Sequence, residues 1–244
     1  MRKLIFLCLF FFSAIISIST NDASKLSYED EEKIVFLHSS CEIRELFEEL
    51  GLQDEVSFQG FKQAVIGFGK VEVKKPILTL IDFSKASTEE RFYVIDMENR
   101  KVLFKSHVAH GRNSGYNYAT SFSNVRGSHQ SSLGFFLTGR TYYGRHGLSL
   151  ILHGLEKGIN DNAKVRTIVI HGADYSDPRQ IRYRGRLGRS LGCPALPHAL
   201  TRPIINTIKD GSLLYVFSER HNEEYLREST ILRGVFNPQN SDVK

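Results

Sequence analysis

The chain has 244 residues, of which 41% are hydrophobic and 24% charged. This balance is typical of a globular protein that buries a core, and it excludes a disordered or fibrous chain. The formal net charge of +5 arises from 32 basic and 27 acidic residues, a nearly even balance that indicates no particular partner.

The first twenty residues have the pattern of a secretory signal peptide. Arg2 and Lys3 precede an apolar run over residues 4–18, and polar residues follow from Ser19. This run is short for a bilayer span of roughly 20 residues, which favours a cleaved signal over a membrane anchor. The sequence therefore predicts a signal peptide over 1–20 and an exported protein of the periplasm or cell envelope. We expect no stable membrane insertion after cleavage and no nucleic-acid partner.

The segment that follows predicts helices over residues 27–69, because apolar residues recur at three- and four-residue spacing. Gly51 is expected to end the first helix, and a second helix carries the apolar positions between Phe58 and Phe68. We interpret 21–75 as a helical N-terminal extension.

From residue 76 the pattern changes to short runs rich in β-branched and aromatic residues, separated by polar turns. Strands are expected over 76–82, 91–96, 101–105, 134–138, 148–152, 167–170 and 213–217, with a helix over 200–209. The predicted fold class is mainly β, with one catalytic domain over 76–220 and a polar C-terminal tail over 221–244.

A histidine and a cysteine are the strongest candidates for chemistry. His171 ends an apolar strand and precedes Gly172, and Cys193 follows 22 residues later in a turn between Gly192 and Pro194. A thiol with a pKa of about 8.5 is mostly protonated at neutral pH, so it needs a neighbouring base to become a nucleophile. The pattern predicts Cys193 as nucleophile and His171 as its base.

The neighbours of this pair have predicted supporting roles. The backbone N–H groups of Gly192 and Cys193 are expected to face a developing oxyanion, whereas Pro194 has no N–H to offer. The group that orients His171 is either the Asp174 carboxylate or the Gly172 carbonyl. His153 is interpreted as a wall of the same cleft or as a structural histidine, and His198 as a surface residue at the start of the last helix.

Five arginines precede the cysteine, at positions 179, 182, 184, 186 and 189. Most charge runs are solvated loops. Beside a nucleophile, however, such a run can also dock an anionic polymer or the carboxylates of a peptide.

Two structural alternatives compete with a reactive thiol. In an oxidising compartment Cys41 and Cys193 allow one disulfide, although the loop position of Cys193 favours a free thiol. A zinc site would need His107 and His110 together with the candidates above, and no second ligand pair has metal-site spacing. We expect neither a metal nor a cofactor.

The segments Ile170–Ala173 and Gly188–Leu196, with a Ser-x-Gly-Cys-Pro-Ala motif, resemble the YkuD-type murein L,D-transpeptidase family. The likeness extends upstream through 108–115, 122–124, 131–135 and 154–163, and covers roughly residues 78–217. It implies a β-sandwich-like catalytic domain whose partners are peptidoglycan stem peptides.

The resemblance also implies a mechanism. Cys193 would attack the L,D peptide bond of a tetrapeptide stem, release D-Ala and form a thioester, and an amine of a second stem would accept the acyl group. His171 would match the base, the Gly172 carbonyl its orienting group, and Ser190 and Gly192 the turn around the thiol.

One position departs from the family pattern. The wider family usually places an arginine two residues after the cysteine, where this chain has Ala195. Arg186 or Arg189 is expected to hold the substrate carboxylate instead. Two other functions remain open: a hydrolase (L,D-carboxypeptidase or endopeptidase) that uses the same acyl-enzyme, and a non-catalytic wall-binding module. A papain-like peptidase is disfavoured, because in those enzymes the nucleophile precedes the histidine in the sequence and here it follows.

Overall fold

The computed structural model describes residues 40–233. The predicted signal peptide and the first part of the predicted helical extension lie outside these residues. The chain divides into two compact units after Cys41, and the description below concerns the second. In the described part of the chain, no helix is both long enough and apolar enough to cross a membrane.

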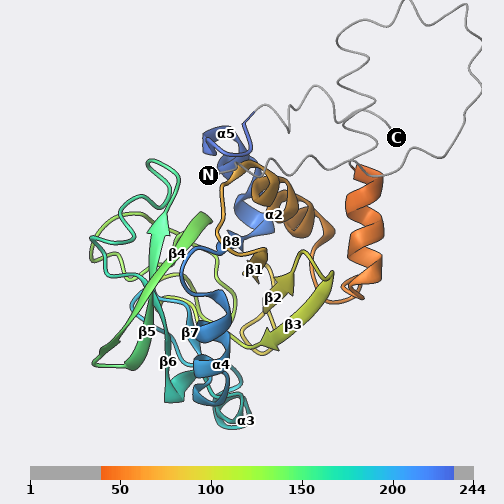
Figure 1. Ribbon diagram of the computed structural model, residues 1–244. Helices are drawn as coiled ribbons and strands as arrows, with labels where there is room; N and C mark the ends of the chain where they lie inside the picture. The colour runs from red at the N-terminus through yellow and green to blue at the C-terminus, as the bar shows by residue number, and fades with distance from the viewer. Residues whose placement is uncertain (1–39, 234–244) are drawn as a thin grey trace, which may run out of the picture. The chain divides into compact units, whose positions relative to one another are not determined.

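Eight strands form one mixed sheet in the order β3-β2-β1-β8-β4-β5-β6-β7 (Figure 1). The strands are β1 Ile77–Asp82, β2 Phe92–Asp96, β3 Lys101–Ser106, β4 Gly134–Gly144, β5 Gly147–Gly154, β6 Val169–Gly172, β7 Ala195–Leu196 and β8 Leu213–Phe217. The mainly β fold class is confirmed, and the predicted strands all form.

The centre of the sheet joins the two halves of the chain. β1 runs antiparallel to β2 but parallel to β8, and β8 runs antiparallel to β4. Every residue of β1 and β8 is buried, because both faces of these central strands are covered. This is why both segments read as continuous apolar runs in the sequence and not as alternating ones.

Helix α2, Phe58–Lys70, packs against β1 and β8. Two of its glycines permit this close approach, since a Cβ at Gly60 would lie 2.7 Å from the Phe217 ring and one at Gly67 would collide with Phe135. The preceding helix covers residues 40–49 in the described chain, and Gly51 follows it with a φ of +66°. Gly51 therefore ends the first helix as predicted, because glycine enters this conformation without steric cost.

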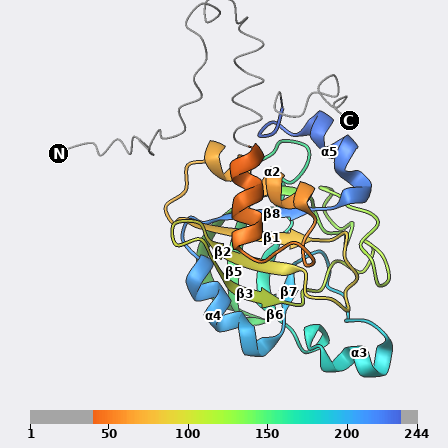
Figure 2. The same ribbon diagram turned by 90° about the vertical axis from the view of Figure 1, so that its right-hand side faces the viewer.

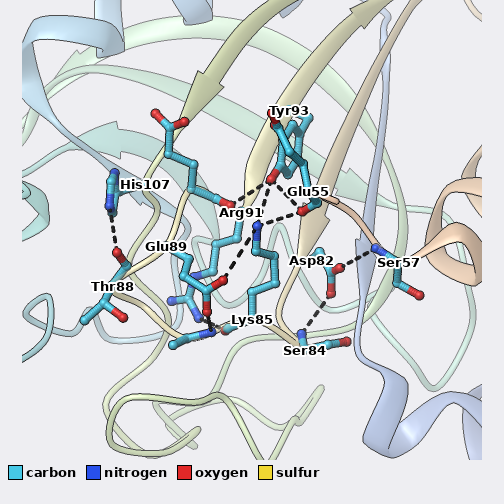
Figure 3. A network of polar contacts seen from close by, with 12 residues as sticks. Glu55, Ser57, Asp82, Ser84, Lys85, Thr88, Glu89, Arg91, Tyr93 and His107 are labelled. Atoms are coloured by element: carbon cyan, nitrogen blue, oxygen red, sulfur yellow. Dashed lines mark hydrogen bonds and ion pairs between the residues drawn. The ribbon is translucent and has the colours of Figure 1, made fainter. Parts of the chain in front are cut away.

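A polar network fastens the connection before α2 to the first strands (Figure 3). The Lys85 ammonium donates to the Glu55 carbonyl at 2.7 Å, and the Tyr93 hydroxyl donates to the same oxygen at 2.9 Å. The Asp82 carboxylate accepts from the Ser57 backbone N–H at 3.2 Å. These bonds make residues 55–57 part of the same folded body as the sheet.

The remaining helices are α3 Arg179–Arg184, α4 His198–Ile208 and α5 Asn222–Glu228. α4 confirms the predicted last helix of the domain and packs against β5 and β6, and Figure 2 shows α3 and α4 well away from α2. α3 was not predicted, because its arginines carry no apolar periodicity. α5 forms within the segment interpreted as a polar tail, so part of that segment is ordered.

Candidate active site

Strand pairing brings the predicted nucleophile and base together. β6 and β7 run parallel, with His171 opposite Ala195 and Gly172 opposite Leu196. Cys193 precedes β7 by two residues, so the cysteine turn lies beside the strand that carries His171. On the other side of β7, Ala109 pairs with Ala195. Residues that are 22 positions apart in the sequence therefore meet at one edge of the sheet.

The turn around Cys193 is closed by Ser190. The Ser190 hydroxyl donates to the Cys193 carbonyl at 2.6 Å and accepts from the Gly192 N–H at 3.0 Å. Gly192 has a φ of +124°, and a Cβ there would lie 2.9 Å from the Gln130 carbonyl oxygen. Glycine is required for both reasons. Because Ser190 occupies the Gly192 N–H, the Cys193 N–H is left as the donor without an acceptor among the described residues.

The hydrogen bond at His171 determines its tautomer. Nδ1 lies 2.9 Å from the Gly172 carbonyl oxygen, which can only accept. In the neutral ring Nδ1 therefore carries the proton, and Nε2 is left with a lone pair that can take one. Asp174, the other candidate for orienting His171, faces His198 instead, with 3.4 Å between carboxylate and imidazole.

Both members of the pair are shifted towards their uncharged forms. Burial raises the pKa of the Cys193 thiol, and a backbone hydrogen bond at Val169 and the charge of Arg166 offset this only in part. Burial lowers the pKa of His171, and the nearby His146 and His198 lower it further, against the opposing effect of the Gly172 hydrogen bond. The thiol donates to the Thr167 carbonyl, with 3.5 Å between sulfur and oxygen. Both shifts favour a neutral thiol and a neutral imidazole in the resting state.

A cavity of about 540 Å³ lies beside His171. Its walls are the turn between β4 and β5, the end of β6, and the first turns of α4. The lining residues are Arg145–Leu148, Gly172–Tyr175, His198, Thr201 and Arg202. His146, at the tip of the β4–β5 hairpin, stacks on His171 with 4.4 Å between ring centroids and 23° between ring planes.

Sequence reasoning missed the contribution of this hairpin. β4 extends to Gly144, well beyond the predicted end at residue 138, because its outer end is largely exposed and carries no apolar pattern, whereas β5 begins at Gly147, one residue before the predicted start. Sequence proximity does not place His146 next to His171 either. His198 is an exposed residue at the start of α4, as predicted, but it also lines the cavity.

The two arginines predicted to contact substrate face a loop. Arg186 and Arg189 lie 4.2 and 5.5 Å from the Tyr116 ring centroid, and Arg189 donates to the carbonyls of Arg112 and Gly115 at 3.0 and 2.9 Å. Neither lines the cavity. Their contact with substrate remains a prediction.

The remaining candidate histidines lie apart from the thiol. His153 is exposed next to Gly139 of β4 and does not line the cavity, so its role in the cleft also remains a prediction. His107 contacts the Thr88 carbonyl at 3.1 Å, and His110 contacts Arg91. Between residues 40 and 233, no three histidine, cysteine or acidic side chains are grouped to hold a metal ion. Cys41 and Cys193 are both free thiols.

Arg166 was not singled out from the sequence, yet it organises the loop beside the nucleophile. Its guanidinium donates to the Ser123 carbonyl and the Ser132 hydroxyl, both at 2.5 Å, and to the Gln130 carbonyl at 2.6 Å. It also carries the positive charge that partly opposes the rise in the Cys193 pKa. A single arginine in a polar turn leaves no sequence signal for such a role.

Residues 52–217 match a family model described as the L,D-transpeptidase catalytic domain. The chain belongs to this family, which confirms the resemblance carried by the His171 and Cys193 segments.

The solved structures that match the chain are distant from it in sequence. An L,D-transpeptidase from Mycobacterium smegmatis is 15% identical, with 58% of each chain covered and a TM-score of 0.36. The helical cell shape determining protein Pgp2 from Campylobacter jejuni is 17% identical, with 61% of this chain and 48% of that chain covered and a TM-score of 0.36. The chain thus spans about half of these proteins. No curated protein has a significant match.

Proposed function

We propose that the protein is a murein L,D-transpeptidase in which Cys193 is the nucleophile and His171 the general base. The single observation that carries the proposal is the pairing of β6 with β7, which sets a Nδ1-protonated histidine beside the cysteine turn. The substrate is the tetrapeptide stem of peptidoglycan, and the protein acts in the cell envelope after export.

The first half-reaction starts from the neutral pair. Nε2 of His171 takes the thiol proton as sulfur attacks the carbonyl carbon of the L,D peptide bond, forming a carbon–sulfur bond. The Cys193 N–H donates to the resulting oxyanion. When the tetrahedral intermediate collapses, the carbon–nitrogen bond breaks, His171 returns the proton to the departing amine, and D-Ala leaves. The product is a thioester on Cys193.

The second half-reaction reverses these roles. An amine of a second stem attacks the thioester, His171 removes the proton of the amine, and the thiol is restored as the new amide forms. Deprotonation at the moment of attack suits a buried, neutral pair, because no charged thiolate has to be maintained in the resting enzyme.

The test is intact-mass spectrometry of purified protein incubated with a defined disaccharide tetrapeptide. We expect a mass increase equal to the substrate minus D-Ala, lost in Cys193→Ser and retained in Cys41→Ser. An adduct that persists in Cys193→Ser contradicts the assignment of the nucleophile. Repeating the reaction with and without an amine acceptor separates crosslinking from hydrolysis, since an L,D-carboxypeptidase releases the same product in both.

A further inference from the structure

The cavity beside His171 is lined by two guanidinium groups from different elements. Arg145 lies at the tip of the β4–β5 hairpin and Arg202 in the first turns of α4. In the described part of the chain Arg145 has no hydrogen bond or ion pair, and Arg202 has only a long contact of 3.4 Å with the Tyr143 hydroxyl. Both are thus available to an anionic ligand. The one acidic residue in the lining, Asp174, faces His198.

We propose that this cavity is the subsite for the terminal carboxylate of the donor peptide, held by Arg145 and Arg202. The inference rests on the proposed function and deepens it, since it names the group by which the enzyme selects its substrate. Guanidinium is suited to the task because its planar set of donors matches the two oxygens of a carboxylate.

The cavity lies beside the base through two residues of its lining. Gly172, whose carbonyl orients His171, lines it, and His146 both lines it and stacks on the His171 ring. Tyr175 lines it as well, and burial, with a smaller contribution from the Cys193 charge, raises the pKa of Tyr175 to about 12. A ligand in the cavity is therefore close to the imidazole of His171.

The chemistry of the leaving group points to the same place. His171 must protonate the departing amine, so that nitrogen lies at the imidazole during the reaction. In D-Ala the carbon bearing the amine also bears the carboxylate, which keeps the two groups within a few ångströms. A subsite for this carboxylate must adjoin His171, as the cavity does. A stem extended by one further residue would present an uncharged amide there.

Other candidates for this role are less well placed. Ala195, at the position where the wider family has arginine, is fully buried and packs in a small apolar cluster with Ala109, Ala173 and Leu187. Arg186 and Arg189 are engaged with Tyr116, and Arg189 also with backbone carbonyls. Of the arginines discussed, only Arg145 and Arg202 line the cavity beside the base.

The experiment compares a tetrapeptide donor with its C-terminal carboxamide, using the rate of Cys193 acylation measured by mass spectrometry. Hydrogen bonds to charged groups contribute enough to predict that the wild type acylates about ten- to hundred-fold faster with the free acid. Arg145→Ala, Arg202→Ala and the double variant should lose this preference through slower reaction of the acid, with the amide rate unchanged. Arg202→Lys should retain part of it.

Arg140→Ala is the matched control, because Arg140 is an exposed arginine of the same hairpin that does not line the cavity. It should keep the full preference. The inference is overturned if wild type reacts equally with acid and amide, or if the variants slow both substrates to the same extent. Either result leaves the proposed function intact, provided an adduct forms on Cys193. If the wild type forms no Cys193 adduct with either substrate, both the subsite and the proposed function are contradicted.

Discussion

Two buried histidines flank the nucleophile segment, and their chemistry is opposite. His171 places Nδ1 against the Gly172 carbonyl, so Nδ1 carries the proton and Nε2 is free to accept one. His110 places Nδ1 2.8 Å from the guanidinium of Arg91, which can only donate, so the proton of His110 is on Nε2. The partner of Nδ1 thus decides which histidine serves as a base, although both are buried within the same domain.

The environment of His110 makes it a structural residue. Arg91 is fully buried and donates to the Val108 carbonyl at 2.8 and 3.1 Å as well as to His110. Burial and the charge of Arg91 lower the pKa of His110 to about 3. The His110 carbonyl accepts from the Ser190 N–H at 2.9 Å, so this histidine supports the cysteine turn through its backbone.

The largest expected effect separates the two histidines by activity. General-base assistance is typically worth about a hundred- to ten-thousand-fold in rate, so His171→Ala should lower acylation by at least about a hundred-fold. His110→Asn keeps an oxygen that can accept from Arg91 and should lower acylation far less. Rates of adduct formation at neutral pH measure both. A greater loss in His110→Asn than in His171→Ala would mean that the base is wrongly assigned.

A smaller effect is expected in the way the free energy of unfolding depends on pH. His110 has an unfolded pKa of about 6.5 and a folded pKa of about 3, so below pH 6.5 the unfolded chain binds a proton that the folded chain does not. Stability should therefore fall as pH decreases from about 6.5 towards 3, by up to about 4 kcal/mol from this group. In His110→Asn this contribution is absent.

Urea unfolding at several pH values measures the difference. The wild type should lose more stability than His110→Asn between pH 6.5 and 4. If the free energy of unfolding changes equally with pH in the two proteins, His110 titrates normally in the folded state. His171→Ala is the comparison variant. Burial also lowers the pKa of His171, so His171 likewise makes the folded state less stable as the pH falls.

The smallest effect is expected in thiol labelling. Because burial raises the pKa of Cys193, iodoacetamide should react slowly at pH 6 to 7 and faster only as pH rises above the ordinary thiol range. A neutral pair predicts that His171→Ala changes this profile by less than about ten-fold while acylation falls much further. Fast labelling at pH 6 that is lost in His171→Ala would instead indicate a thiolate–imidazolium pair.

The buried carboxylate of Glu156 is an example of a contact that the sequence pattern does not predict. The Glu156 carboxylate is fully buried and accepts from the Phe135 N–H and the Tyr225 hydroxyl at 2.9 Å each, and from the Ser229 hydroxyl at 2.5 Å. The segment around Glu156 was recognised from the sequence only as part of the family likeness. Its contacts with residues of α5 and just beyond it explain why part of the predicted polar tail is ordered.

The sequence by itself determined the elements whose signal is local. β1 and β8 were predicted from short apolar runs bounded by polar turns, which the structure explains by covering both faces of these strands. Gly51 and Gly192 mark turns that other residues enter only with strain. The Cys193 turn and the strand-end position of His171 were also local patterns.

The tertiary structure alone decided which groups surround the base and the thiol. His146, Arg145 and Arg202 reach the cavity from a hairpin tip and a helix that are far apart in the sequence, and Arg166 acts through a loop more than thirty residues upstream. The tautomers of His110 and His171 likewise depend on which acceptor or donor packs against Nδ1. Burial and long-range contacts set these properties, and neither is encoded in the residues adjacent along the chain.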